Sequence, residues 1–279
     1  MPERGSVAAP DLIVIPARYG SQRLPGKPLI SIAGQTLLGR VVAVAEDAVR
    51  RIGRAEIVVA TDDDRIAAHA QDLGCAAVLT DPAISSGSGR AWAAAAVRTP
   101  APPIVVNLQG DAPFVAPDTI AALIGALRAS SCGVATPVVR LSWDALDALR
   151  DHKRLSPFSG TTCTRRADGR ALWFSKTVIP AIRDEAWLRG DDALSPVYRH
   201  IGLYAYRYAA LERFEATPPT TYERLEGLEQ LRFLEQGVDI ATIEVPPPRH
   251  AMSGIDTAED VAMAERLIAL HGEPALSWT

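Results

Sequence analysis

Short apolar runs alternate with segments of helical periodicity along most of this 279-residue chain. Residues 12–15 form a continuous apolar run, which is typical of a strand that is buried on both faces. Further strands are predicted at residues 56–60, 76–79, 104–108, 133–139 and 238–245. Because helical segments separate these strands, the pattern predicts a doubly wound, mostly parallel α/β sheet.

The helical segments carry their own start signals. Apolar residues recur at helical spacing from 37 to 45, residues 61–64 supply capping groups for a helix that ends near Leu73, and Pro117 opens a helix that ends near Arg128. An alanine-rich helix is predicted after residues 85–90, and two more helices at 220–236 and 257–270. Along one side of the segment 220–236 lie four leucines that are expected to pack in the core: Leu225, Leu228, Leu231 and Leu234.

Residues 158–208 break this rhythm. Short apolar pieces at 171–174 and 201–206 are separated by polar, proline-containing stretches such as 189–196. This pattern predicts an inserted antiparallel region rather than another strand–helix–strand unit. We therefore expect a single domain over residues 11–271 that contains the insertion, with flexible termini at 1–10 and 272–279.

A basic, glycine-containing loop follows the first strand and carries Arg18, Gly20, Arg23, Gly26 and Lys27. Glycines let the backbone approach phosphate oxygens closely, and guanidinium groups offer two parallel hydrogen bonds to them. Ligands of open α/β sheets lie beyond the carboxyl ends of the strands. The loop therefore predicts a polyphosphate site.

Two other interpretations of this loop are weaker. A P-loop has four residues between its glycines and ends in Lys-Ser or Lys-Thr, whereas here five residues separate Gly20 from Gly26, and Pro28 follows Lys27. An ordinary surface turn rarely concentrates so much positive charge. The spacing thus argues against a P-loop kinase or ATPase.

Composition narrows the class of protein further. The formal net charge of −4 argues against a general nucleic-acid binder. Three widely spaced cysteines without a metal-ligand pattern indicate a reducing compartment. The sequence shows no apolar run long enough to span a membrane and no signal-peptide core near its start, so we expect a soluble, cytoplasmic protein.

Six motifs in order give the chain a specific family resemblance: IPARYGSQRLPGKPL, the SSGSGR loop, VNLQGDAP, RHIGLYAY, LEQLRFL and GIDTAEDV. Over about residues 11–270 the chain resembles the CMP-KDO synthetases, or 3-deoxy-manno-octulosonate cytidylyltransferases. The resemblance implies a Rossmann-like sheet of the nucleotide-diphospho-sugar transferase type and a homodimer formed through the inserted region. It also implies a lipopolysaccharide-biosynthesis reaction that couples CTP to the 2-keto sugar acid KDO with Mg²⁺ and releases pyrophosphate.

The resemblance also assigns roles to residues. It implies a catalytic set of Arg18, Arg23, Lys27, Asp111 and Asp256, in which the two aspartates hold Mg²⁺. Carboxylate oxygens suit this hard cation, and fixed positive charge suits the charge that develops during transfer at the α-phosphate. Nucleotide binding is implied for Ala17, Arg18, Gly20, Arg23, Lys27, Ser86, Gly87, Arg90 and Asp111. Binding of the acidic sugar is implied for Gln109, Lys176, His200, Tyr204, Glu229 and Arg232.

Simpler interpretations of several of these residues stay open. Asp256 could cap the last helix, and Asp111 could be a turn residue at the end of a strand. By residue type alone, His200 is better explained as a core histidine. Glu229 lies off the leucine stripe and could belong to a solvated helix face.

The chain departs from the family pattern around the nucleotide and the acceptor. Gly89 and Ala112 stand where the family has acids, and Lys176 stands where it usually has arginine, which keeps the charge but loses the planar fork. Ile84 and Ser85 replace His-Gln, and residues 157–160 differ from an Asn-x-Val-Lys pattern. Three hypotheses follow: a KDO cytidylyltransferase, a relative that activates another acidic sugar or a small anionic acceptor, or a non-catalytic nucleotide-sugar binding protein. The departures also lead us to expect measurable but poor activity with KDO.

Overall fold

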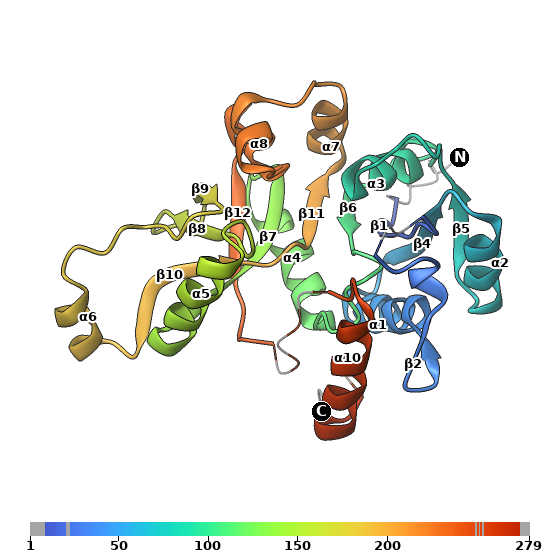
Figure 1. Ribbon diagram of the computed structural model, residues 1–279. Helices are drawn as coiled ribbons and strands as arrows, with labels where there is room; N and C mark the ends of the chain where they lie inside the picture. The colour runs from blue at the N-terminus through green and yellow to red at the C-terminus, as the bar shows by residue number, and fades with distance from the viewer. Residues whose placement is uncertain (1–8, 21–22, 249, 251, 253, 274–279) are drawn as a thin grey trace.

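The protein is described by a computed structural model that covers residues 9–20, 23–248, 250, 252 and 254–273. Its centre is a ten-stranded mixed sheet (Figure 1). Nine of the strands follow the order β5-β4-β1-β6-β11-β7-β10-β8-β9, and the tenth, β12, lies off this path and pairs with β7. The expected flexible termini fall largely on residues 1–8 and 274–279, which lie outside the described residues.

The parallel part of the sheet confirms the predicted strand–helix alternation. Its strands are β1 (Asp11–Pro16), β4 (Ala55–Thr61), β5 (Ala76–Leu79) and β6 (Ile104–Asn107). β1 pairs in parallel with both β4 and β6, and β4 pairs in parallel with β5. The connecting helices are α1 (Leu37–Ile52), α2 (Asp64–Asp72) and α3 (Gly87–Ala96), followed after β6 by α4 (Pro117–Ala129).

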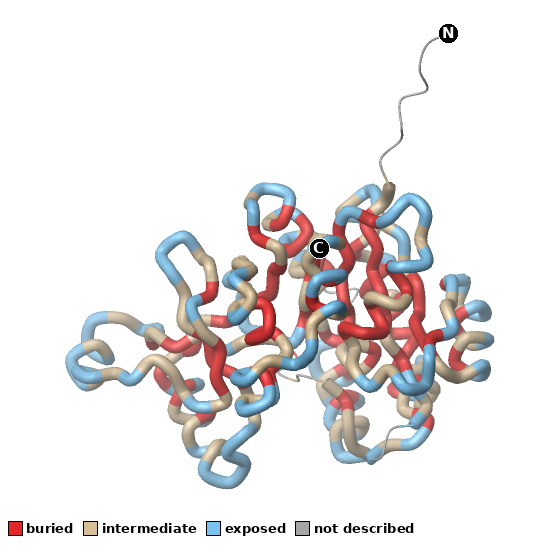
Figure 2. Tube along the Cα trace, turned by 90° about the horizontal axis from the view of Figure 1, so that it is seen from above, coloured by how far each residue is buried: buried red, intermediate tan, exposed pale blue. Residues whose placement is uncertain are grey.

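Burial along β1 explains its continuous apolar run. Ile13 and Ile15 belong to a core that also contains residues of α1, α4 and the last helix, α10 (Ala258–His271). Leu12 and Val14 point to the other face, where the core contains alanines of α3 and Leu211 of α7 (Tyr208–Glu215). Successive side chains of a strand point to opposite faces, so a strand covered on both sides needs an apolar residue at every position. Figure 2 shows these central strands as buried.

The second half of the sheet is mixed. β7 (Val134–Ser142) pairs in parallel with β12 (Ile240–Glu244) and antiparallel with β11 (Tyr204–Arg207) and β10 (Leu194–His200). β11 also pairs with β6, so this strand joins the two halves of the sheet. The predicted insertion at 158–208 therefore contains one strand, β11, that lies in the middle of the sheet.

The rest of that region extends the sheet to one side, at the left of Figure 1. It consists of β8 (Thr162–Arg165), β9 (Ala171–Ser175), α6 (Glu185–Asp191) and β10, next to α5 (Trp143–Leu155). All strand pairs within it are antiparallel, as predicted. The helix α5 was not among the predicted elements. Shorter elements elsewhere are the 3-10 turn η1 (Lys27–Leu29) and the hairpin of β2 (Ser31–Ile32) and β3 (Gln35–Thr36).

The prediction of one helix over 220–236 is wrong. The segment forms α8 (Thr221–Glu226) and α9 (Gln230–Glu235), and Gly227 between them adopts φ 63, a left-handed conformation that ends a helix. Leu228 and Leu231 are buried as expected, but Leu225 is 75% exposed, because the break turns α8 relative to α9.

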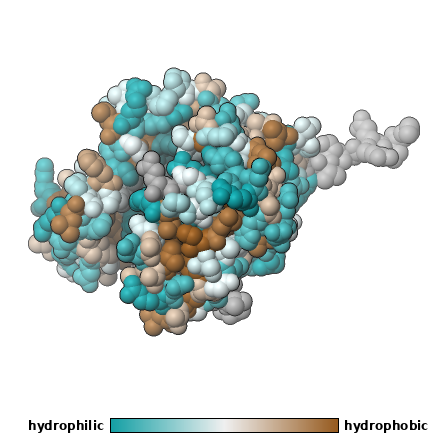
Figure 3. Space-filling view, turned by 45° about the vertical axis from the view of Figure 1, so that its right-hand side comes forward, coloured by the Kyte–Doolittle hydropathy of each residue, from teal (hydrophilic) through white to brown (hydrophobic). Residues whose placement is uncertain are grey.

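Figure 3 shows a mainly hydrophilic face with an apolar patch near its middle. Within the described part of the chain, no helix combines the length and the apolar character that crossing a membrane requires.

Candidate active site

A cavity of about 410 Å³ opens at the carboxyl ends of β1 and β6. Three segments that are distant in sequence meet there: the loop after β1, the start of α3 and the turn after β6, together with Asp256 before α10. The lining residues are Pro16, Ala17, Arg18, Arg23, Lys27, Pro28, Ser85, Ser86, Gly87, Arg90, Gln109, Gly110, Asp111 and Asp256. The loop predicted from its charge to bind an anion thus lies at the edge of the sheet where ligands are expected.

The loop after β1 folds back on itself through Tyr19 and Gly26. The Gly26 N–H donates to the Tyr19 carbonyl at 3.1 Å, and Gly26 has φ 69. A Cβ at Gly26 would lie 3.2 Å from the Tyr19 ring, whose outer face carries the Arg65 guanidinium at 3.4 Å from the ring centroid. Gly26 therefore serves the turn that aims Lys27 into the cavity, while Gly20 is exposed and has nothing within 4 Å of a Cβ position.

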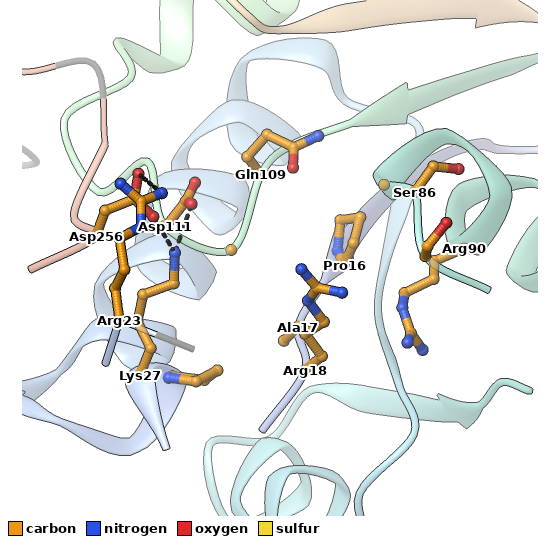
Figure 4. A pocket seen from close by; sticks show the side chains of 14 residues that line it. Pro16, Ala17, Arg18, Arg23, Lys27, Ser86, Arg90, Gln109, Asp111 and Asp256 are labelled. Carbon is orange, nitrogen blue, oxygen red and sulfur yellow. Dashed lines mark hydrogen bonds and ion pairs between the residues drawn. The ribbon is translucent and has the colours of Figure 1, made fainter. Parts of the chain in front are cut away.

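Lys27 lies between the two predicted metal ligands (Figure 4). Its Nζ donates to Asp111 Oδ2 at 2.7 Å and to Asp256 Oδ1 at 3.0 Å. Arg23 reaches the same group from outside, with Nη2 3.1 Å from Asp256 Oδ2. The structure thus brings together four of the five residues in the predicted catalytic set, and the fifth, Arg18, lines the same cavity.

Backbone contacts bring Asp256 to Asp111. The Ile255 N–H donates to the Asp111 carbonyl at 2.9 Å, and the Ile255 side chain is fully buried in the core. The preceding Gly254 packs against Asp111, since a Cβ there would lie 3.4 Å from the Asp111 carbonyl oxygen. One buried apolar residue thus anchors a segment whose next side chain faces the cavity.

The interpretation of Asp256 as a helix cap is wrong. Thr257 is the N-cap of α10, its Oγ1 accepts from the Asp260 N–H, and Asp260 completes the capping box. Asp260 Oδ2 also accepts from the Asp256 N–H at 2.9 Å. Because Thr257 and Asp260 cap the helix, the Asp256 carboxylate is available to pair with Lys27 and Arg23. Asp111 does lie in a turn, closed by the Ala112 N–H on the Gln109 carbonyl, but its carboxylate points to Lys27.

The opposite side of the cavity is the start of α3, shown with Ser86 and Arg90 in Figure 4. Ser86 is the N-cap, and its Oγ accepts from the Gly89 N–H at 2.9 Å. Arg90 is only 3% exposed and donates to Thr80 Oγ1 and Asp62 Oδ2, each at 2.6 Å. These contacts make Arg90 a rigid part of the wall.

The structure describes all six residues that were predicted to bind the sugar acid. Of these six, Gln109 alone lines this cavity. Its Nε2 donates to Asn107 Oδ1 at 2.9 Å, and a Cβ at Gly87 would lie 2.8 Å from the same Nε2. Gly87 therefore leaves the room that the Gln109 amide occupies. The implied contact of Gln109 with the sugar acid and that of Gly87 with the nucleotide stay predictions.

Three of the other five lie in a half-buried polar layer beside β11. Glu229 Oε2 accepts from Ser88 Oγ at 2.6 Å, which ties Glu229 to the start of α3. Tyr204 donates to Gln230 Oε1 at 3.0 Å, and its ring lies 5.4 Å from that of His200. His200 Nε2 bonds to Thr136 Oγ1 at 2.9 Å. The bond between Glu229 and Ser88 joins this layer to the start of α3, which lines the cavity.

Burial and charge perturb the ionisation of this layer. Enclosure of the ring, with the Lys176 ammonium as a smaller cause, lowers the pKa of His200 to about 3. Burial also raises the pKa of Tyr204 well above its ordinary value. Both side chains are therefore neutral at pH 7, which suits hydrogen bonding better than proton transfer.

Arg232 has a structural partner. Its Nε and Nη2 donate to the two oxygens of Glu223, at 2.7 and 2.5 Å, and its Nη1 donates to the carbonyls of Phe214 and Thr217. The side chains of Arg232 and Glu223 are 10% and 9% exposed. This pairing holds α8, α9 and the end of α7 together, and the implied contact of Arg232 with the sugar stays a prediction.

The glycine at the family's acidic position is enclosed by its neighbours. A Cβ at Gly89 would lie 2.9 Å from Ile84 Cγ2, 3.0 Å from Ser86 Oγ and 3.6 Å from Glu215 Oε1. Burial raises the pKa of Glu215. An acidic side chain is thus present near Gly89, supplied by α7 rather than by position 89.

Four lining residues are absent from the predicted set: Pro16, Pro28, Ser85 and Gly110. Gly110 shows the clearest reason for its identity, since a Cβ there would lie 2.5 Å from the Pro16 carbonyl oxygen. The signal in the sequence was the glycine between Gln109 and Asp111, which is typical of a close backbone approach.

Comparisons with known proteins identify the class of this chain. Residues 12–240 match the model of a protein family described as cytidylyltransferase. The fold and the comparison thus define the class: the chain belongs to the cytidylyltransferases.

More specific relatives define the family within that class. The 3-deoxy-manno-octulosonate cytidylyltransferase of Maricaulis maris (strain MCS10) is 41% identical over 263 residues, which cover 94% of this chain and 98% of the relative. The enzyme of that name from Vibrio cholerae serotype O1 (strain M66-2) is 37% identical, over 92% of this chain and 97% of the relative. The chain belongs to the 3-deoxy-manno-octulosonate cytidylyltransferase family.

Solved structures extend the comparison. A structure of CMP:2-keto-3-deoxy-manno-octonic acid synthetase complexed with CTP is 33% identical, with a TM-score of 0.80, and covers 94% of this chain and 99% of that chain. A cytidylyltransferase from Leptospira borgpetersenii serovar Hardjo-bovis (strain JB197) is 15% identical with a TM-score of 0.58, covers 96% of this chain and 90% of that chain, and shows the fold alone. The predicted fold class is confirmed.

Proposed function

We propose that this chain transfers the cytidylyl group of CTP to the anomeric hydroxyl of a 2-keto sugar acid, KDO or a close relative, and releases pyrophosphate. In this reaction the hydroxyl gives its proton to solvent and its oxygen bonds to the α-phosphorus of CTP. The bond from that phosphorus to the α–β bridging oxygen breaks, and this oxygen leaves with pyrophosphate. The observation that carries the proposal is the meeting of Lys27, Asp111 and Asp256 on the wall of the cavity.

The cavity offers different chemistry on its two sides. Arg23 and Lys27 lie on the side of the aspartates, whereas Ser86 and Arg90 lie on the other, with residues 16–18 between them (Figure 4). We place the triphosphate along Arg18, Arg23 and Lys27, where fixed cations stabilise the charge on the transferred group and on departing pyrophosphate. The base and ribose then lie against Ser86 and Gly87.

Asp111 and Asp256 would hold Mg²⁺. Two half-exposed carboxylates that face one cavity fit this ion, which usually takes one or two carboxylates together with phosphate oxygens and water. Among the described residues, no group of three or more acidic, histidine or cysteine side chains could hold a metal by itself. When bound, the metal supplies Lewis-acid polarisation of the phosphoryl oxygens.

The acceptor is proposed to lie between Gln109 and the layer that contains His200, Tyr204 and Glu229. Gln109 offers an amide at the cavity, and the neutral His200 and Tyr204 side chains offer hydrogen bonds to sugar hydroxyls without a cost in charge burial. Lys176 adds a positive charge near His200, which suits a sugar acid.

Pyrophosphate release tests this function directly. The protein is incubated with Mg²⁺, each of the four nucleoside triphosphates in turn, and a panel of sugar acids that includes KDO. We expect turnover that needs CTP and a 2-keto sugar acid together. High efficiency with KDO alone would contradict the expectation of a shifted acceptor, and absence of turnover with every acid would contradict the proposed function.

We also propose a cytoplasmic homodimer that forms through the antiparallel extension. Apolar side chains protrude there: Leu155 is 87% exposed, Phe158 78% and Trp187 68%. Exposed apolar groups of this size are typical of interaction surfaces. Sedimentation should give twice the chain mass of 29.8 kDa, and Phe158→Ser with Trp187→Ser should shift it toward the monomer.

A further inference from the structure

The two predicted metal ligands share one protein cation. Lys27 Nζ lies 2.7 Å from an oxygen of Asp111 and 3.0 Å from an oxygen of Asp256, so one ammonium group bridges both carboxylates. Neighbouring carboxylates alone would repel each other and attract any cation. In the structure the Lys27 ammonium relieves this repulsion.

Lys27 is better placed for this role than Arg23. The Lys27 side chain is 14% exposed and contacts both aspartates, whereas Arg23 is 66% exposed and contacts Asp256 alone. Water screens an exposed pair strongly and a buried one much less. Lys27 therefore contributes most of the charge that balances the two carboxylates.

The backbone and side chain of Lys27 differ in freedom. The backbone is fixed at the start of η1, where the Lys27 N–H donates to the Leu24 carbonyl and the Lys27 carbonyl accepts from Ile30. The ammonium is carried on a flexible four-carbon stem. It can therefore leave the aspartates while the loop keeps its shape.

We infer that Lys27 is the resident cation of the two-aspartate site, so that a divalent metal binds tightly only when a triphosphate draws the ammonium away. Lys27 is then a positioning residue for Asp111 and Asp256 before the metal enters, and a phosphate ligand afterwards. The inference deepens the proposed function and rests on it. Two carboxylates balanced by Lys27 and Arg23 offer a divalent ion little net charge, and the phosphates supply both the missing metal ligands and a new partner for Lys27.

Binding of Mn²⁺ alone tests the inference, followed by electron paramagnetic resonance of the free ion. Lys27→Met removes the ammonium and keeps a long side chain. We expect this variant to bind Mn²⁺ at least about tenfold more tightly than the wild type without nucleotide, since a positive charge next to both ligands is gone. Adding CTP without any acceptor should strengthen Mn²⁺ binding greatly in the wild type and much less in Lys27→Met.

Matched variants separate charge from shape. Arg23→Met removes an exposed cation from the same loop and should tighten Mn²⁺ binding less than Lys27→Met does. Lys27→Arg retains a cation and should bind Mn²⁺ as weakly as the wild type. Asp111→Asn added to Lys27→Met should abolish the gain, because it removes a ligand.

Two results would overturn the inference. One is Mn²⁺ binding by Lys27→Met that is no tighter than in the wild type. The other is an equal gain in Arg23→Met, which would indicate a general effect of loop charge. If thermal melting shows that Lys27→Met is unfolded, Lys27→Gln is judged by the same criteria. No turnover is measured here, so failure of this inference is distinguishable from failure of cytidylyl transfer.

Discussion

Two charged clusters, each containing at least one residue that the family resemblance placed at the site, behave differently in the folded protein. Lys27, Asp111 and Asp256 lie on the cavity wall, with 14%, 31% and 42% of their side chains exposed. Arg232 and Glu223 are 10% and 9% exposed and lie in a junction of short helices. The first cluster is accessible to a ligand and the second is enclosed by protein.

Hydrogen-bond capacity separates the two clusters further. The Arg232 guanidinium donates to both oxygens of Glu223 and to the carbonyls of Phe214 and Thr217, so most of its donors are used. Each aspartate near Lys27 keeps lone pairs directed toward the cavity. Charge type alone therefore does not distinguish a binding group from a structural one; exposure and unused hydrogen-bonding capacity do.

The largest expected effect comes from removing a carboxylate at the cavity. Asp111→Asn and Asp256→Asn should each lower kcat by about 10²–10³-fold or more, since each removes a ligand of the same ion. Because the two act through one ion, the double variant should be little worse than the worse single one. Pyrophosphate release measures the rates, with the exposed Asp118→Asn on α4 as the control. Multiplicative losses in the double variant would show that the two aspartates act separately.

Breaking the enclosed pair should instead affect folding. Arg232→Met leaves Glu223 buried without its partner, and we expect the free energy of unfolding to fall by about 3–5 kcal/mol. Urea titration measures it, with Arg224→Met as a control, because Arg224 is exposed and its side chain donates to the Pro219 carbonyl rather than to a buried carboxylate. A stable Arg232→Met protein with a raised KM for the sugar acid would show that Arg232 serves the acceptor after all.

A smaller effect is expected where the backbone of the site is tight. Gly110→Ala would put a Cβ 2.5 Å from the Pro16 carbonyl oxygen, which forces the turn after β6 to shift. Overpacking of this kind typically costs about 1–3 kcal/mol. Gly125→Ala, in α4 with nothing within 4 Å of its Cβ position, should instead stabilise the helix by up to about 1 kcal/mol. Thermal melting compares the two, and equal melting temperatures would contradict the expected strain at Gly110.

The smallest effect concerns the pH dependence of the His200 layer. Enclosure lowers the pKa of His200 to about 3 in the folded protein, against 6.5 as its ordinary value. Between these values the unfolded chain binds the proton and the folded chain does not, so stability falls as pH drops below about 6.5, by up to about 1.4 kcal/mol per pH unit. His200→Gln should flatten this slope between pH 7 and 5 in urea titrations. The matched control is His152→Gln, at an exposed position of α5. An unchanged slope in His200→Gln would contradict the lowered pKa.

Local signals in the sequence were enough for most of the backbone. The apolar run at residues 12–15 identified a strand covered on both faces, and its residues do alternate between the two cores. The segment 76–79 coincides with β5, and Pro117 is the first residue of α4, because both signals come from residues close together in the sequence. The single helix predicted over 220–236 failed at Gly227, where a backbone preference outweighed the leucine periodicity.

Only the tertiary structure decided which charges meet. The sequence by itself determined a strand followed by a basic loop, two aspartates near element ends, and a family. It did not determine that Ile255, by packing in the core and donating to the Asp111 carbonyl, brings Asp256 to Lys27. Nor did the sequence determine that Arg232 forms an ion pair with Glu223. A local pattern reports the conformation and burial of one segment, whereas an ion pair depends on the relative position of distant segments, which the packing of the whole core fixes.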